Sequence, residues 1–334
     1  MKATYYLVCG RTALAIYRSQ ADGERLARLL HQEAMGMRVA SRMLPEDARP
    51  KAPGKRIACA LSAMLDTPLP IEALVVEPAS RRQSAYTRTI LDSDPFHALS
   101  CIHFENDIFV ASPELLYYQL TRGRNIATSW MLGSELCGRY ALDSDAKGGM
   151  HDRPPLTTPE ALDRFFARSH MPCSHAAGKR ILPYLKAGAR SPKEAEIAAL
   201  MALPRRMGGR GIPGITLNRT ITLTPEAARV AKRSHLEGDA YLETIDENVE
   251  YDSDTHHLSR EAHERDERKA NALRMMGVSL TTITAGQLNS WSAIDAILDG
   301  LSRKGGFHKR LETPDIKQTQ QHLWRELLSG RARI

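Results

Sequence analysis

Residues 238–257 read G-D-A-Y-L-E-T-I-D-E-N-V-E-Y-D-S-D-T-H-H, and this stretch decides how the C-terminal half of the chain is interpreted. Residues 239–242 and 249–252 have the composition of two short strands, and the polar segment E-T-I-D-E-N between them indicates a turn. The stretch therefore predicts a β-hairpin, in which Asp239 should lie beside Glu250.

Acidic side chains crowd this hairpin, although the chain is basic overall. From Glu237 to Asp254 there are eight carboxylates and no Lys or Arg: Glu237, Asp239, Glu243, Asp246, Glu247, Glu250, Asp252 and Asp254. The chain carries +7, so everything outside these residues sums to +15. Strand side chains alternate between two faces, so Glu250 and Asp252 should share one. Two or three carboxylates on one face would suit Mg²⁺ (or Mn²⁺), because hard cations take oxygen ligands. The alternative is an acidic hairpin exposed to solvent.

A longer pattern continues from the hairpin. It comprises Asp239, Glu250-Tyr251-Asp252-Ser253, His257, Arg265-Asp266, Lys269, Asn271-Ala272-Leu273, Gly277 and a strand that ends at Ile283-Thr284. This order and spacing resembles the very-short-patch-repair-like branch of the PD-(D/E)XK nuclease superfamily, over about residues 187–303. The resemblance implies an α/β fold with a C-terminal restriction-endonuclease-like mixed sheet flanked by helices. It also implies metal-dependent hydrolysis of phosphodiester bonds in DNA, in repair or in defence against foreign DNA.

The resemblance assigns roles to four residues of the hairpin region. Asp239 matches the metal-binding Asp, and Glu250 matches the second acidic ligand. Asp252 stands where the superfamily usually has its Lys, and would add a third ligand. His257 matches a histidine that assists proton transfer, the alternative being an exposed histidine at the start of a helix.

The missing Lys separates two functions. Arg265, Arg268 or Lys269 on the next helix are candidates to replace it, which would preserve an active nuclease. Without a replacement, the domain would be a degenerate nuclease domain in a non-catalytic DNA-binding regulator. A pure protein-interaction module is a third interpretation, and it predicts no salt-dependent DNA binding.

Two interpretations also compete for Glu194. Ser191-Pro192-Lys193-Glu194 has the S-x-x-E spacing of a capping box, with Pro at the first helical position. In the resembling family an acidic residue of this first helix faces the metal site, so Glu194 is either a cap or a fourth metal ligand.

DNA is the expected partner, since the sequence pI is near 9.2. The candidate phosphate contacts lie before the hairpin and on the helix after it: Arg229, Lys232, Arg233, Arg265, Arg268 and Lys269. For residues 224–235 the alternative is a solvated loop.

Residues 1–143 are expected to form an α+β N-terminal domain, for which DNA binding is a candidate role because its helical segments carry basic residues. Residues 98–103 and 108–111 read as strands, and Ser112-Pro113-Glu114 opens a helix with an N-cap. This junction is similar to a segment of abortive-infection antitoxins of type IV toxin–antitoxin systems, although an ordinary strand-to-helix junction explains it equally. Residues 144–186 are expected to form a linker and helical connector. Residues 304–334 are expected to form a basic, partly disordered tail.

The remaining composition indicates a cytoplasmic protein. Its five cysteines are scattered without a C-x-x-C motif, which argues against a zinc ribbon or a disulfide framework. No apolar run approaches the roughly 20 residues that a membrane span needs, so no membrane association is expected. A homodimer is compatible with the sequence.

Overall fold

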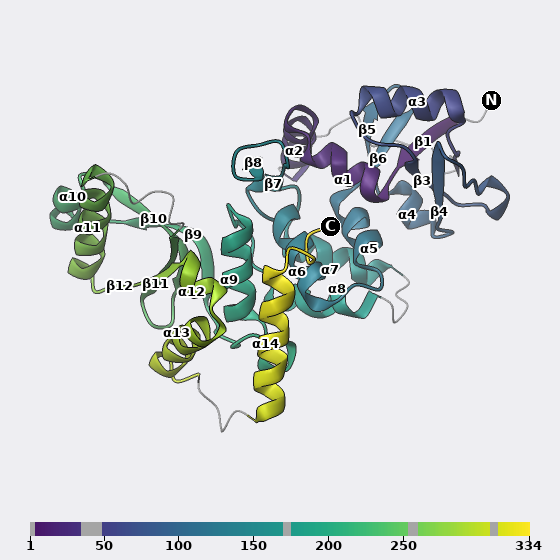
Figure 1. Ribbon diagram of the computed structural model, residues 1–334. Coiled ribbons are helices and arrows are strands. Elements are labelled where there is room, and N and C mark those ends of the chain that lie inside the picture. The colour runs from purple at the N-terminus through teal and green to yellow at the C-terminus, as the bar shows by residue number, and fades with distance from the viewer. Residues whose placement is uncertain (1–3, 35–48, 170–174, 253–259, 308–312) are drawn as a thin grey trace. The chain divides into compact units, whose positions relative to one another are not determined.

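The computed structural model describes residues 4–34, 49–169, 175–252, 260–307 and 313–334 (Figure 1). The chain divides into two compact units. The N-terminal unit comprises residues 1–125 and 136–182, and the C-terminal unit comprises residues 126–135 and 183–334. Both are mixed α/β, with mixed sheets flanked by helices. Among the described residues, no helix is both long enough and apolar enough to span a bilayer.

The N-terminal unit is built on one mixed sheet. Its strands are β1 (Thr4–Val8), β2 (Arg49–Pro50), β3 (Ile71–Val75), β4 (Thr87–Leu91), β5 (Cys101–Glu105) and β6 (Ile108–Ala111). The order is β4-β3-β1-β6-β5, with β2 paired to β1. The β1–β6 and β3–β4 pairs are parallel, whereas β1–β3 and β5–β6 are antiparallel.

Seven helices and a small hairpin complete the described part of this unit. They are α1 (Gly10–Arg18), α2 (Gln20–Ala34), α3 (Lys55–Met64), α4 (Pro95–Leu99), α5 (Pro113–Thr121), α7 (Pro159–Arg168), α8 (Ala176–Ile181), β7 (Tyr140–Leu142) and β8 (Met150–Asp152). The Ser112 hydroxyl caps α5 as expected, accepting from Leu115 N. The strand expected at residues 98–103 is only half right, because Asp94 caps a short helix that extends to Leu99. The expected connector contains β8, α7 and α8, which belong to this unit.

The C-terminal unit contains the acidic hairpin in a four-stranded sheet. Its strands are β9 (Ile215–Thr222), β10 (His235–Leu242), β11 (Glu247–Asp252) and β12 (Ser279–Thr284), in the order β12-β11-β10-β9. β9, β10 and β11 form an antiparallel meander. β12 is parallel to β11, since α11 (Arg260–Met275) carries the chain back across the sheet. The predicted hairpin is therefore confirmed, with β10 beginning four residues earlier than expected.

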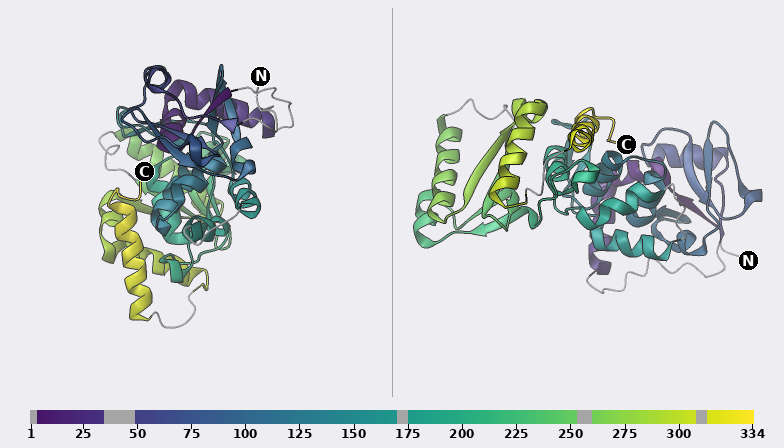
Figure 2. Two further views of the ribbon diagram at one scale, coloured as in Figure 1. Left: turned by 90° about the vertical axis from the view of Figure 1, so that its right-hand side faces the viewer. Right: turned by 90° about the horizontal axis from the view of Figure 1, so that it is seen from below.

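A helix replaces the loop considered for residues 224–235. It is α10 (Pro225–Ala231), which the Thr224 hydroxyl caps by accepting from Ala227 N. α10 and α11 lie side by side (Figures 1 and 2). Their apolar residues pack with residues of β9 and β10 in a cluster that includes Ile221, Leu236, Tyr241 and Leu273. This packing fixes the direction of α11. The polar residues of the helix do not take part in the cluster.

The described part of this unit contains further α-helices: α6 (Ile126–Leu136), α9 (Pro192–Ala202), α12 (Ala285–Asn289), α13 (Trp291–Lys304) and α14 (Pro314–Leu328). The expectation of a partly disordered tail is wrong for residues 313–334, because α14 packs on α9. Thr313 caps α14, and Gln320 Nε2 donates to Gly209 O over 3.3 Å. The Trp130 indole of α6 donates to Ala195 O of α9 over 2.8 Å.

Candidate functional site

Asp239 and Glu250 meet where the pairing of β10 with β11 ends. The last paired residues are Ala240 and Val249, so the next residue outward on each strand is one of the two carboxylates. Beyond this point the Asp239 side chain provides the contact between the two strands, because its Oδ2 accepts a hydrogen bond from Tyr251 N over 2.9 Å. The sequence thus places two acidic side chains opposite each other at the open end of a hairpin, as expected.

A lysine from α11 contacts this pair. The Lys269 ammonium forms an ion pair with Glu250 Oε1, which also accepts from Asn248 Nδ2 over 2.6 Å. The Glu250 and Lys269 side chains are 19% and 24% exposed, so solvent screens their attraction only partly. Of the three basic residues considered as replacements for the missing Lys, Lys269 is the one that contacts a site carboxylate.

Burial raises the pKa of both carboxyl groups. For Asp239 the increase in pKa is opposed by the Tyr251 N–H and by the charges of Lys269 and Arg190. For Glu250 burial again raises the pKa most, Lys269 lowers it, and the charge of Asp239 raises it further. The two carboxyls and Lys269 therefore form one electrostatically coupled group.

Glu194 belongs to the same electrostatic group but has a capping role. Burial and the charge of Asp239 raise its pKa. Its Oε1 accepts from Ser191 Oγ over 2.9 Å, and its Oε2 accepts from Arg190 N over 2.9 Å and Asn218 Nδ2 over 2.6 Å. Ser191 Oγ in turn accepts from Glu194 N over 3.2 Å. The carboxylate therefore completes the N-terminus of α9, and its assignment as a metal ligand stays a prediction.

Asn218 positions Glu194, and sequence reasoning missed it. It lies in β9 between the pairs Arg219–Gly238 and Leu217–Ala240, with a left-handed backbone of φ 50°. Its amide nitrogen donates to both Glu194 Oε2 and Gly188 O, the latter over 3.0 Å. Asn tolerates this backbone better than most residues, and this is the one signal that could have indicated the position.

The two other predicted site residues of the hairpin region are Asp252 and His257. Asp252 is the last residue of β11 and lies opposite Thr284 of β12. His257 lies outside the described residues. Within the described ranges, no three or more His, Cys, Asp or Glu side chains lie close enough to hold a metal ion. The clamp of three carboxylates expected from the sequence therefore stays a prediction.

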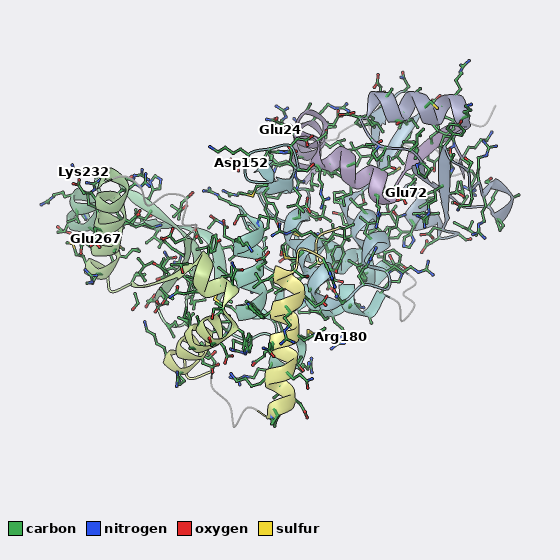
Figure 3. All side chains as sticks on the ribbon, viewed as in Figure 1. Glu24, Glu72, Asp152, Arg180, Lys232 and Glu267 are labelled. Atoms are coloured by element: carbon green, nitrogen blue, oxygen red, sulfur yellow. The ribbon has the colours of Figure 1, made fainter. Side chains whose placement is uncertain are left out.

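A hollow of about 740 Å³ opens beside Glu250. Three of the six predicted phosphate contacts line it, namely Arg233, Arg265 and Lys269, and Glu237 also lies on its wall. The other three do not line it. Arg229 of α10 and Lys232, directly after this helix, are exposed, and Arg268 of α11 pairs with Glu264 at 3.8 Å. Figure 3 marks Lys232 and Glu267 on the outer side of α10 and α11.

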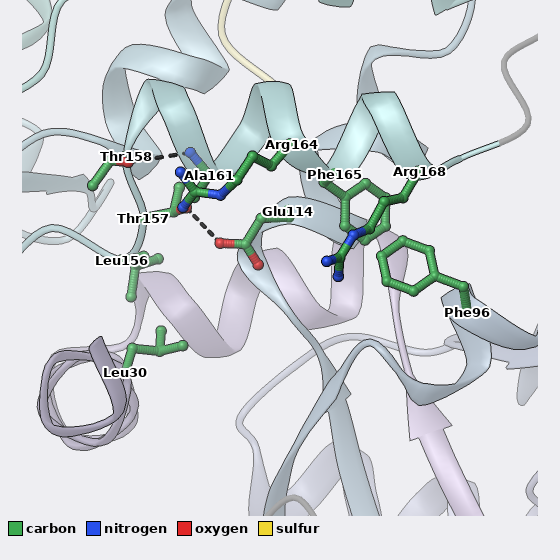
Figure 4. A pocket seen from close by; sticks show the side chains of 10 residues that line it. All are labelled: Leu30, Phe96, Glu114, Leu156, Thr157, Thr158, Ala161, Arg164, Phe165 and Arg168. Carbon is green, nitrogen blue, oxygen red and sulfur yellow. Dashed lines mark hydrogen bonds between the residues drawn. The ribbon is translucent and has the colours of Figure 1, made fainter. Parts of the chain in front are cut away.

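The N-terminal unit contains a different kind of hollow. It measures about 420 Å³ and is lined by Arg164 and Arg168 of α7, with Phe96 and Phe165 beside them (Figure 4). At its wall Thr157 Oγ1 donates to Glu114 Oε1 over 2.5 Å. None of the candidate catalytic, metal-binding or DNA-binding residues predicted from the sequence lines it.

An Asp–His–Ser chain also occurs in this unit. His97 Nδ1 lies 2.6 Å from Asp92 Oδ2, and His97 Nε2 lies 2.9 Å from Ser169 Oγ. The Ser169 side chain is buried, and its hydroxyl donates to Phe165 O over 2.9 Å at the end of α7. A buried hydroxyl engaged with a helix terminus is not an exposed nucleophile, so we interpret this chain as structural.

Comparison of the chain with protein-family models, with curated proteins and with solved structures found no match. The assignment of a function to the Asp239–Glu250–Lys269 site therefore rests on its geometry and on the sequence pattern.

Proposed function

We propose that the C-terminal unit is a metal-dependent endodeoxyribonuclease of restriction-endonuclease-like fold, which hydrolyses phosphodiester bonds in DNA. The observation that carries this proposal is the meeting of Asp239 and Glu250 beside Lys269. They lie next to a hollow whose wall carries three basic side chains (Arg233, Arg265 and Lys269) and three acidic ones (Glu237, Glu250 and Asp266). The order of elements supports it. A capped helix, a hairpin with both carboxylates, a helix with basic residues and a closing strand follow one another as the resemblance implies.

The donor set fits a divalent cation. Mg²⁺ in proteins is usually held by one or two carboxylates together with substrate phosphate oxygens, so two suffice. Asp239 Oδ1 and Glu250 Oε2 accept no hydrogen bond from any described residue, whereas the second oxygen of each side chain is engaged. These two residues would hold the cation. When bound, it supplies a Lewis acid for the phosphoryl group and lowers the pKa of the attacking water.

Lys269 supplies the positive charge that is missing from β11, where Asp252 stands in place of the superfamily's usual Lys. Its ammonium lies against Glu250, where it can stabilise negative charge that develops on the phosphoryl group. Glu194 and Asn218 support the arrangement from α9 and β9. Asp252 as a further ligand and His257 as the proton-transfer group remain part of the proposal.

The test is nicking of supercoiled plasmid DNA by the purified chain in Mg²⁺ and in Mn²⁺. Nicking should disappear in Asp239→Ala and in Glu250→Ala. Glu243→Ala is the matched control, because it removes an exposed carboxylate at the other end of the hairpin and should leave nicking intact. Unchanged cleavage in both site variants would remove the assignment.

A non-catalytic DNA-binding regulator is the second candidate function. The observation that favours it is the Lys269–Glu250 ion pair, because a lysine already neutralises one of the two proposed ligands. The resemblance of the N-terminal unit to antitoxins agrees with such a role. Salt-dependent DNA binding without cleavage in either metal would decide for the regulator.

A further inference from the structure

Arg190 reaches from the start of α9 to the edge of the site. It directly precedes the N-cap residue of the helix, and its backbone N–H donates to Glu194. Its guanidinium donates two hydrogen bonds to Glu237 of β10, from Nη1 to Oε2 over 2.5 Å and from Nη2 to Oε1 over 3.1 Å. Glu237 is only two residues before Asp239, so this contact lies at the same end of β10 as the proposed site.

The contact has the geometry of anion recognition. Two parallel N–H donors of a guanidinium match the two oxygens of a carboxylate, and they match two oxygens of a phosphate equally well. The charge of Arg190 also lowers the pKa of Asp239, which places the guanidinium within electrostatic range of the carboxylates. Glu237 lines the same hollow as Glu250 and Lys269.

This ion pair is easily exchanged. The Arg190 and Glu237 side chains are 39% and 40% exposed, and pairs in contact with water contribute little to stability. Arg210 of the same unit shows the contrast. Its side chain is 1% exposed and is held by Asp295 and by Asp299, as expected of a structural arginine.

We propose that Arg190 is a phosphate-binding residue and that Glu237 occupies its guanidinium until a DNA phosphate displaces it. The proposal depends on the proposed function for the identity of the ligand, a phosphodiester next to the scissile bond. Glu237 thereby acts as a competitor carried by the chain itself. It weakens binding of DNA that cannot place a phosphate at this position.

The test is a double-mutant cycle measured by fluorescence anisotropy. The probe is a short fluorescein-labelled DNA duplex, with EDTA present so that binding is measured without cleavage. Glu237→Gln should raise affinity by about two- to five-fold, the fold-change that corresponds to loss of an exposed ion pair. Arg190→Ala should lower affinity and reduce the slope of log K against log salt by about one. Arg190→Lys should recover the slope but not the full affinity, because it restores the charge without the fork.

The coupling between the two variants decides the question. If Glu237 competes for Arg190, the gain from Glu237→Gln should largely disappear in the Arg190→Ala background. Glu243→Gln measures the general effect of removing one carboxylate and should give the same small gain in both backgrounds. An equal gain from Glu237→Gln in both backgrounds would overturn the proposal, as would absence of DNA binding by the unmodified chain. Binding with intact coupling but no nicking in metal would sustain Arg190 and refute the nuclease.

Discussion

Replacement of Lys269 by Met should destabilise the C-terminal unit, since it leaves Glu250 with a raised pKa and without its cation. Removing one partner of a fully buried ion pair costs about 3–5 kcal/mol, and an exposed pair contributes about 1 kcal/mol at most. At 19% and 24% exposure this pair lies between the two limits, so we expect a loss of about 2 kcal/mol. For a unit of this size that loss lowers the melting temperature by about 4–8 °C.

The assay can follow this unit alone. The chain has three tryptophans, Trp130, Trp291 and Trp324, and all three belong to the C-terminal unit. Their fluorescence therefore reports its thermal unfolding, even if the N-terminal unit unfolds separately. The matched variant is Lys269→Met with Glu250→Gln, in which the isolated charge is removed while Gln can still accept from Asn248. This double variant should regain most of the lost stability.

The pH dependence gives the decisive result. Burial raises the folded-state pKa of Glu250, so keeping it ionised costs stability. That cost is absent below the unfolded-state pKa and complete above the folded-state pKa. The difference between the original chain and Lys269→Met should therefore shrink as the pH falls through the carboxyl range. A penalty that is independent of pH, or that persists in the double variant, would mean that Lys269 acts through packing of its stem.

Two further variants test the surroundings of this pair. Asp239→Asn should melt at a higher temperature than the original chain at neutral pH without metal, because burial raises the Asp239 pKa and Asn keeps an acceptor for Tyr251 N. The gain in melting temperature should vanish in acid, and nicking should be lost. A lower melting temperature at neutral pH would contradict the reasoning. Asn218→Gly keeps the left-handed backbone but removes two hydrogen bonds. The free energy of unfolding, followed by tryptophan fluorescence, should therefore fall by about 1 kcal/mol or more. An unchanged melting temperature would refute the positioning role of Asn218.

Local chemistry made much of the fold predictable from the sequence. Ser112, Thr158 and Ser191 each stand before a Pro at the first helical position, and each caps a helix in the structure. The hairpin was predictable because its strands are short and its turn is polar. The same T-P-E and T-P-D signals open α10 and α14 at Thr224 and Thr313, yet basic composition favoured a loop and a tail there.

The site was only partly predictable, because its remaining contacts join distant segments. The pairing of Asp239 with Glu250 follows from hairpin register alone. The choice of Lys269 over Arg265 depends on how α11 packs on β9 and β10, which no local pattern specifies. The contact between Arg190 and Glu237 spans 47 residues and two elements, so the sequence shows only two ordinary surface charges.

The charge balance of the site distinguishes it from the structural ion pairs of the same unit. Glu196 is fully buried, and both Lys193 and Arg333 pair with it. Glu247 is 3% exposed, with Lys304 on one oxygen and Thr281 on the other.

At the proposed site, by contrast, Lys269 directly contacts Glu250 and acts on Asp239 only through its charge. Among the described residues, no cationic side chain forms an ion pair with Glu194 or Asp239. Burial raises all three pKa values, so the arrangement costs stability instead of providing it. Glu196 and Glu247 are each paired with a cation, whereas this site keeps an excess of negative charge that adds no stability. An additional cation would remove the excess, and this is the physical reason to look for a metal at Asp239 and Glu250 before any other place in the chain.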